Sequence, residues 1–269
     1  MTAFVSGDPK MIESFQKGRD IYSSIASISF NLPYEECFEF NPITGAQQPE
    51  GKARRSEAKV ILLGMNYGRS VNSLADQLYG KNDDMTDEEK LKGAQRICDI
   101  FSKQFPSVPK AIKAAQDFAR IHGYVETILG RRRHLPNMQL PMYEFEPLPG
   151  YVNPDVDPLD TTTLLAESSK IPPRVVAALT EKLSKCRYAG QRYTITQELR
   201  EKYNIKVINH SKEISKASRQ CFNSVIQGSA AEQTKLAILM LETDPRWKAI
   251  GGRLILPVHD RPVINLLWT

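Results

Sequence analysis

The sequence predicts an α+β fold that is mostly helical and contains small antiparallel hairpins. Apolar residues recur at helical spacing over much of the chain. Two apolar runs near the C-terminus, Arg253–Val258 and Val263–Trp268, flank a short polar turn. The composition, 41% hydrophobic and 25% charged, is that of an ordinary globular protein. A chain of 269 residues can bury a sizeable core in one or two domains.

Turn-forming residues separate the first predicted elements. Met1 to Val5 is predicted to be the end of an apolar helix or strand, and Ser6-Gly7-Asp8-Pro9 a turn that restarts a helix at Pro9. Helical spacing then continues through Met11, Ile12, Phe15, Ile21 and Ile25. Residues 31–53 are rich in proline and glycine, including Pro49 and Gly51, and are predicted to be turns without regular structure.

Four further helices are expected before residue 124. A capping box of Thr86 and Glu89 precedes the third, and Gly123 is a typical stop for the fourth. The expected helices are residues 54–67, residues 71–79, the segment between Thr86 and Phe105, and the segment from Ser107 to His122.

The second half of the chain is predicted to alternate between extended and helical segments. Residues 124–135 read as a hairpin with a turn near Gly130. Residues 136–160 are predicted to be a loop, and residues 161–206 a mixed helical and basic region. One long helix is expected from about Ser211 to Leu241, with Gly228 as its weak point.

The net charge and the cysteine content indicate which partners and which cellular compartment to expect. The net charge of +5 permits a nucleic-acid partner without requiring one. The four cysteines form no CxxC pair, which argues against a disulfide framework and favours a reducing compartment. No apolar stretch approaches the ~20 residues that span a bilayer, and the N-terminus lacks a signal-peptide pattern. We therefore expect a cytoplasmic protein without a membrane partner, in a bacterium or in the host of a virus.

A cationic stripe follows the helix at residues 54–67. Arg55, Lys59, Leu63 and Tyr67 are each four residues apart, and at about 100° per residue they stay on one face. Two cations near a helix N-terminus suit a polyanion such as a triphosphate, and the ring further along suits a base. The alternative is a solvated basic face with Tyr67 packed in the core.

A second stripe lies on the long helix near the C-terminus. Arg219, Asn223 and Gln227 are also four residues apart, and amide side chains suit polar contacts along a duplex. The small residues 228–231 that follow allow another group to approach closely. An exposed polar stripe is the alternative.

Two shorter features suit phosphate or metal. Arg131, Arg132 and Arg133 form a basic run near Tyr124 that suits phosphate contacts, or is simply a charged surface loop. Asp260 stands between the two C-terminal apolar runs. There a carboxylate can hold a hard cation in company with a second carboxylate, although most such positions are surface turns.

The order of these features resembles a known family. The run Arg55-x3-Lys59-x7-Tyr67-Gly68 resembles the fingers-helix motif of family A DNA polymerases, the family of bacterial DNA polymerase I. Residues 6–26, 123–133, 219–231 and 258–260 resemble further motifs of that family in the right order. The resemblance implies an incomplete polymerase right-hand fold. Its parts would be a palm remnant at 1–30, fingers at 31–135, an insertion of unknown role at 136–207, and a partial palm with the third-motif hairpin at 208–269.

The resemblance also implies a role for each motif residue in template-directed addition of dNTPs to a primer 3′ hydroxyl. Lys59 and Asp260 would be catalytic, with Lys59 donating a proton or stabilising the leaving pyrophosphate, and Asp260 binding Mg²⁺ in a two-ion site. The residues that would bind the nucleotide are Arg55, Lys59, Leu63 and Tyr67. The residues that would contact primer–template DNA are Arg131, Arg132, Arg133, Arg219, Asn223, Gln227 and His259.

Departures from the family pattern qualify these expectations. The family's first catalytic aspartate has no counterpart in the 269 residues. We therefore expect this fragment alone to extend primers very weakly or not at all, and an upstream polypeptide carrying that motif to be a partner. Leu63 replaces an aromatic residue usual in the fingers helix, and Arg261 stands where glutamate is usual. The length of residues 136–207 suggests a phage-like member.

Two alternatives come from other classes of protein. The first is a non-catalytic nucleotide or primer–template binding protein derived from a polymerase. The second is a single-subunit RNA polymerase, which shares the Lys-to-Tyr-Gly helix; residues 124–133 and 227–231 argue against it.

Overall fold

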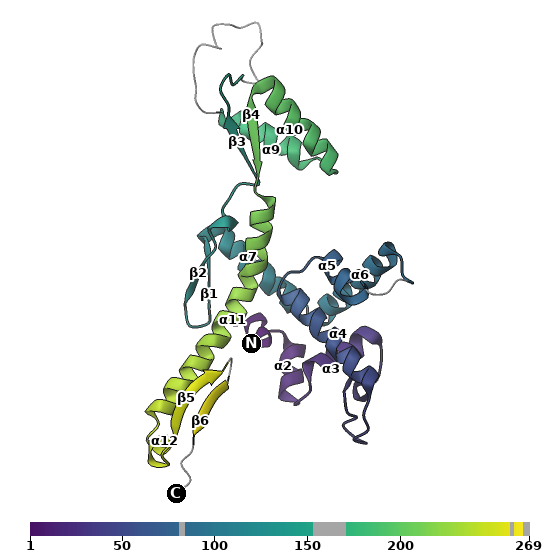
Figure 1. The fold of residues 1–269 in the computed structure, drawn as a ribbon, viewed down its shortest axis with the longest axis vertical. Coiled ribbons are helices and arrows are strands. Elements are labelled where there is room, and N and C mark those ends of the chain that lie inside the picture. Colours follow the sequence, from purple (N-terminus) through teal and green to yellow (C-terminus); the bar gives the residue numbers. More distant parts are fainter. Residues whose placement is uncertain (81–83, 153–170, 259–260, 266–269) are drawn as a thin grey trace. The chain divides into compact units, whose positions relative to one another are not determined.

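The computed structural model describes residues 1–80, 84–152, 171–258 and 261–265, with side chains up to residue 254. In this part of the chain, helices predominate and the strands pair as two-stranded antiparallel sheets (Figure 1), which confirms the α+β prediction. The chain divides into two compact units. The first contains Met1–Met138 and Ala217–Thr269, and the second contains Gln139–Lys216.

The N-terminal helices are α1 (Thr2–Ser6), α2 (Pro9–Gln16) and α3 (Ile21–Phe30), and the last two begin at carboxylate caps. Asp8 accepts a hydrogen bond from Met11 N at 3.1 Å and so caps α2. Asp20 accepts from Ser23 N at 2.8 Å and caps α3. Gly18, with φ +64°, ends α2, so the apolar series predicted from spacing belongs to two separate helices.

Helix α4 (Pro49–Asn66) begins five residues earlier than the predicted 54–67. Pro49 occupies the first turn, where its missing N–H costs nothing. A Cβ at Gly51 would lie 2.0 Å from the carbonyl oxygen of Phe38, because α4 starts against the segment after η1 (Tyr34–Cys37). The prediction that Pro49 and Gly51 interrupt regular structure was therefore wrong.

The core of this unit forms where α3 and α4 pack with α6 (Asp87–Gln104). Helix α5 (Val71–Tyr79) has the predicted bounds and packs on α6, and the predicted capping box of Thr86 and Glu89 starts α6. Helix α7 (Ser107–His122) also has its predicted bounds. The largest buried core side chains include Met11, Ile25, Ile61, Phe101 and Phe105.

A hairpin of β1 (Tyr124–Glu126) and β2 (Arg132–His134) follows, with Val125 opposite Arg133. Gly130, with φ +83°, lies in the turn, as predicted. The 3₁₀ turn η2 (Pro136–Met138) closes this segment, and Met138 is buried beside Val125 and Leu135.

The second unit has its own core. Strands β3 (Tyr143–Pro147) and β4 (Ile205–Asn209) pair antiparallel, with Tyr143 opposite Asn209. Helices α9 (Pro173–Ser184) and α10 (Ala189–Tyr203) bury Val175, Leu179 and Leu199 with Ile205. The prediction of a loop throughout residues 136–160 was wrong at β3, because the partner strand lies some sixty residues away.

The C-terminal elements are α11 (Ser211–Thr243), α12 (Pro245–Ala249), β5 (Arg253–Val258) and β6 (Arg261–Asn265). Helix α11 continues through Gly228 without a break. The expected hairpin forms, but β6 begins at Arg261 and not at Val263, because Val258 pairs directly with Arg261. His259 and Asp260 lie outside the described residues. Among the described helices, none has the length and apolar character needed to cross a bilayer.

Candidate functional site

The C-terminal end of α4 meets the middle of α11. The Tyr67 hydroxyl accepts a hydrogen bond from Gln227 Nε2 at 3.2 Å. A Cβ at Gly68 would lie 3.3 Å from Arg219 Cγ, and Gly68 has φ +61°. The positive φ favours glycine here, and the backbone lies close to Arg219. Two stripes predicted independently from the sequence thus contact each other.

A pocket of about 200 Å³ lies at this junction and is lined by Leu63, Tyr67 and Asn223. Its other walls are mainly apolar side chains of α1, α2 and α3. The side-chain oxygens Asn66 Oδ1 and Asn223 Oδ1 are buried and accept no hydrogen bond from the described protein. Asn66 also lines the pocket. Buried polar atoms are rarely left without partners, so these two amide oxygens mark Asn66 and Asn223 as unusual residues of the pocket wall.

Arg55, one end of the cationic stripe, is bound to Asp20. Its Nε and Nη2 donate to the two carboxylate oxygens at 2.9 and 3.0 Å. Its guanidinium also lies 5.2 Å from the centroid of the Tyr22 ring. A guanidinium has five N–H donors, so this pairing positions Arg55 and leaves donors for an anion.

The pairing shifts the pKa of both groups. Burial acts to raise the pKa of Asp20, but hydrogen bonds from Arg55 and Ser23 outweigh it and the pKa is lowered. The hydrogen bond to Asp20 raises the pKa of Arg55. Both groups are therefore charged at neutral pH.

Lys59, the second cation of the stripe, is exposed on α4. It forms no ion pair with any residue that the structure describes. Its ammonium group is therefore available to an anionic ligand.

The three arginines of the basic run, Arg131, Arg132 and Arg133, differ in their contacts. Arg132 donates to Glu126 Oε1 at 2.9 Å, and its guanidinium lies 4.5 Å from the centroid of the Tyr124 ring. Arg131 and Arg133 are exposed and form no ion pair within the described ranges. Arg131 and Arg133 are thus the better candidates for phosphate contacts.

The small residues after Gln227 allow the turn between β1 and β2 to pack closely against α11. A Cβ at Gly228 would lie 2.7 Å from Thr127 Cγ2. Ser229 is fully buried and accepts a hydrogen bond from Ile128 N at 3.0 Å. The close approach predicted from residues 228–231 is therefore made at least in part by the turn between β1 and β2.

The predicted metal ligand Asp260 and the DNA-contact residue His259 both lie outside the described residues. Among the residues that are described, no three His, Cys, Asp or Glu side chains gather as a metal site would require. The Mg²⁺ site with Asp260 as its ligand therefore stays a prediction from the sequence.

Asp20 is a site residue that the sequence analysis did not assign. Its signal was a capping pattern, Asp20 followed by Ser23 at the start of an apolar helix. That pattern predicts the cap but not the pairing with Arg55, which is 35 residues away.

Comparisons with known proteins agree on one family. The model described as DNA polymerase family A matches residues 1–145 and 164–266. DNA polymerase I of Thermus aquaticus, described as thermostable, is 25% identical over 263 residues, which cover 98% of this chain and 21% of the relative. DNA polymerase I of Mycobacterium bovis is 33% identical over 136 residues, or 51% of this chain and 13% of the relative.

A solved structure shares the fold. It is described as the POL domain of Pol1 from M. smegmatis in complex with DNA primer-template and dNTP, and it is 23% identical with a TM-score of 0.58. The match covers 98% of this chain and 31% of that chain. The chain spans about a fifth of the length of the curated relative from Thermus aquaticus.

Proposed function

This chain belongs to DNA polymerase family A, and from that premise we propose that it supplies the fingers and part of the palm of a DNA polymerase. The reaction is template-directed addition of dNTPs to a primer 3′ hydroxyl. Its partners are dNTPs and primer–template DNA, together with a polypeptide carrying the first catalytic motif.

The junction of α4 and α11 is the observation that carries this proposal. Leu63 and Tyr67 line a pocket together with the amide residues Asn66 and Asn223. An aromatic ring in such a pocket suits contact with a base. Lys59 precedes Tyr67 by eight residues, or roughly 12 Å along a helix. A nucleotide with its base near Tyr67 can therefore extend its phosphates along α4 toward Lys59 and Arg55.

Primer–template DNA is supported as a partner by two observations. Arg131 and Arg133 are exposed cations on a hairpin whose turn packs against α11. The structural relative from M. smegmatis is described with DNA primer-template and dNTP. We assign phosphate contacts to Arg131 and Arg133, and contacts near the insertion site to Arg219, Asn223 and Gln227.

The finer features of the family stay predictions. Family A polymerases are generally metal-dependent, and Mg²⁺ with Asp260 as its ligand is the predicted case here. A cytoplasmic location and a phage origin are likewise expectations from the sequence. Magnesium dependence of primer extension, measured with and without chelator once a complete polymerase is assembled, tests the first of these.

Binding of primer–template DNA tests the proposed site. We expect the 269-residue chain to bind a fluorescein-labelled primer–template in an anisotropy titration. Gln227→Ala should weaken binding about five-fold or more, since it removes one polar contact of about 1 kcal/mol or more. Gln233→Ala, an exposed glutamine on the same helix, is the matched control. Equal affinities of the two variants, or no binding at all, would refute the assignment.

Primer extension distinguishes an active enzyme from a binding protein. We expect the 269-residue chain alone to extend a primer very weakly, because its sequence has no counterpart of the first catalytic aspartate. Robust synthesis by this chain would overturn that expectation. Binding without synthesis, even after an upstream polypeptide with that motif is added, would favour the non-catalytic alternative.

A further inference from the structure

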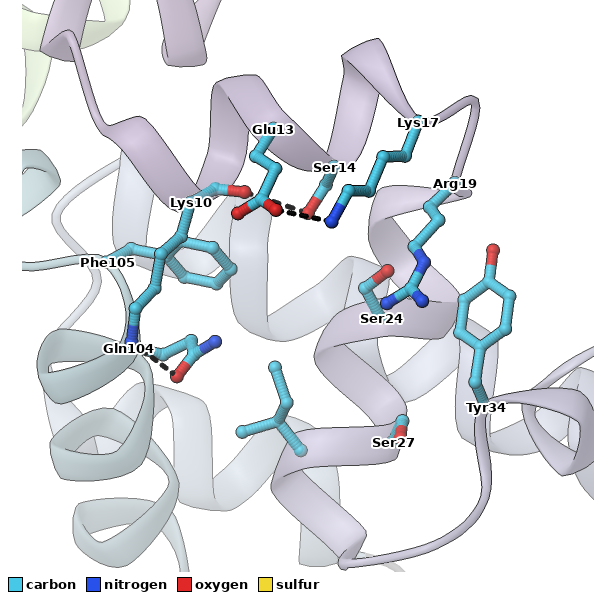
Figure 2. Close-up of a pocket in the computed structure, with 11 residues that line it drawn as sticks. Lys10, Glu13, Ser14, Lys17, Arg19, Ser24, Ser27, Tyr34, Gln104 and Phe105 are labelled. Carbon is cyan, nitrogen blue, oxygen red and sulfur yellow. Dashed lines mark hydrogen bonds and ion pairs between the residues drawn. The ribbon is translucent and has the colours of Figure 1, made fainter.

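A second cavity of about 290 Å³ lies on the other side of α2 from the candidate nucleotide site. Figure 2 shows Lys10, Glu13, Ser14 and Lys17 on its α2 wall, and Arg19 beside Tyr34. Met11 and Phe15, on a different face of α2, line the pocket near Tyr67 instead. The two cavities are therefore separate.

The lining of this cavity is cationic. Among the described residues of the lining, Lys10, Lys17 and Arg19 are accompanied by one acid, Glu13. Lys17 Nζ lies 2.5 Å from Glu13 Oε1, and Lys10 Nζ donates to Gln104 Oε1 at 3.3 Å. An ammonium group has three donors, so each lysine keeps donors for a further acceptor.

Arg19 is held in place by its backbone and by an aromatic ring, with Glu13 as an acidic neighbour that forms no ion pair with it. Gly18 N donates to Phe15 O and Arg19 N donates to Ser14 O, a Schellman motif that fixes the direction in which Arg19 leaves α2. The guanidinium lies 5.5 Å from the centroid of the Tyr34 ring. The neighbouring Asp20 pairs with Arg55, and Arg19 forms no ion pair in the part of the chain that the structure describes.

The serine hydroxyl groups of the lining already donate to the backbone, so the cations are the main hydrogen-bond donors for a ligand. Ser14, Ser24 and Ser27 donate to backbone carbonyl oxygens at 2.9, 3.0 and 2.6 Å. Tyr34 accepts from Asp20 N at 2.8 Å, which fixes its ring under Arg19. Lys17 lines the same cavity as this preorganised guanidinium, whereas Figure 2 shows the Lys10 ammonium group beside Gln104, away from Arg19. A guanidinium and an ammonium group match the charge of an oxyanion.

We propose that this cavity binds a phosphate group through Arg19 and Lys17. The phosphate could be supplied by two sources, a single DNA strand or a free nucleotide. The strand is favoured on the premise of the proposed function, because a polymerase handles single-stranded template as well as nucleotides. Buried Phe105 and the side chain of Ile28 provide an apolar wall for the rest of such a ligand.

The test compares binding of a labelled single-stranded oligodeoxynucleotide and of dATP to the 269-residue chain and its variants. Arg19→Ala and, separately, Lys17→Gln should weaken oligonucleotide binding about five-fold or more. The slope of log affinity against log salt should fall by about 0.7 for each phosphate that the variant no longer neutralises. Arg246→Ala, which removes an exposed arginine paired with Asp244, is the control and should change neither.

Each outcome decides the proposal. Weaker oligonucleotide binding with unchanged dATP binding assigns the site to a strand, and weaker dATP binding alone assigns it to a free nucleotide. Arg19→Ala and Lys17→Gln variants that fold, as judged by far-UV circular dichroism, and bind both ligands like Arg246→Ala would overturn the proposal. A failure of Lys59→Ala to weaken dNTP binding would count against the proposed function and leave this cavity untouched.

Discussion

Asp20 shows how one side chain can serve both the fold and the site. It caps α3 through Ser23 N and holds Arg55 by two hydrogen bonds, while its own amide donates to Tyr34. The carboxylate thus links the start of one helix to the cationic stripe of another. Asp20 therefore pairs with Arg55 and not with the adjacent Arg19.

Substitution of Asp20 separates these two roles. Asp20→Ala should lower the free energy of unfolding by about 1–2 kcal/mol, from the lost cap and a partly exposed ion pair. Asp20→Asn should cost less, because asparagine caps equally well. Urea denaturation measures both, and equal losses for the two variants would mean that the cap contributes little.

The lowered pKa of Asp20 also predicts a dependence on pH. A carboxyl whose pKa is lower in the folded state stabilises the fold above its unfolded value of about 3.9. This stability is lost as the pH falls through the folded value. The stability advantage of the native chain over Asp20→Asn should therefore shrink in acid, below about pH 4. A difference that stays constant from neutral pH to acid would contradict this.

Gly228 provides a second test at the residue scale. Gly228→Ala should destabilise the protein despite the better helix propensity of alanine, because the new Cβ would lie 2.7 Å from Thr127 Cγ2. Thr127→Ser removes that methyl group and keeps the hydroxyl that accepts from Arg131 N. The double variant should regain most of the loss in thermal unfolding. No recovery would show that Thr127 does not set the constraint.

At the scale of elements, Asp8 joins two helices that are distant in sequence. This fully buried carboxylate accepts from Met11 N in α2 through Oδ1 and from Ser107 N in α7 through Oδ2, both at 3.1 Å. The residue therefore caps one helix and anchors another.

The two hydrogen bonds of Asp8 predict that two substitutions destabilise the fold by different amounts. Asp8→Asn keeps one acceptor oxygen and should lose one of the two bonds, whereas Asp8→Ala loses both. We expect losses of about 1 and about 2–3 kcal/mol in the free energy of unfolding. Chemical denaturation at neutral pH is the measurement, and an Asp8→Asn variant as unstable as Asp8→Ala would contradict the two-bond account.

Elements with local signals were predictable from the sequence. The capping box at Thr86, the stop at Gly123 and the turn at Gly130 all lie where the sequence placed them. Elements that depend on distant partners were not. Strand β3 exists because it pairs with β4, and Pro49 begins α4 although prolines alone suggest a break.

Some features of the candidate site were likewise predictable from the sequence, and others were not. Spacing placed Tyr67 and Gln227 on two stripes, and the structure joins them by a hydrogen bond. The pairing of Arg55 with Asp20 and the burial of the Asn66 and Asn223 amide oxygens depend on packing between helices, which spacing along one helix cannot reveal. The roles of the site residues remain predictions for experiment.

At the scale of the whole molecule, two units with separate cores predict separable stability. Ile205 is fully buried in the core of the second unit with Leu179 and Leu199. Ile205→Ala should cost about 2–5 kcal/mol locally. Hydrogen exchange should then show loss of protection in α9 and α10, while α4 keeps its protection. Equal loss in α4 would show that the units unfold together.

The central claim is that α4 binds the triphosphate of a nucleotide whose base lies near Tyr67. The most direct measurement is an equilibrium titration of the chain with a dNTP, comparing Lys59→Ala with Lys92→Ala, an exposed lysine on α6 that pairs with Glu88. Removal of one charge-assisted hydrogen bond should raise the Kd for Lys59→Ala roughly ten-fold, with little change for Lys92→Ala. Equal Kd values for the two variants, or no saturable binding by the native chain, would contradict the account.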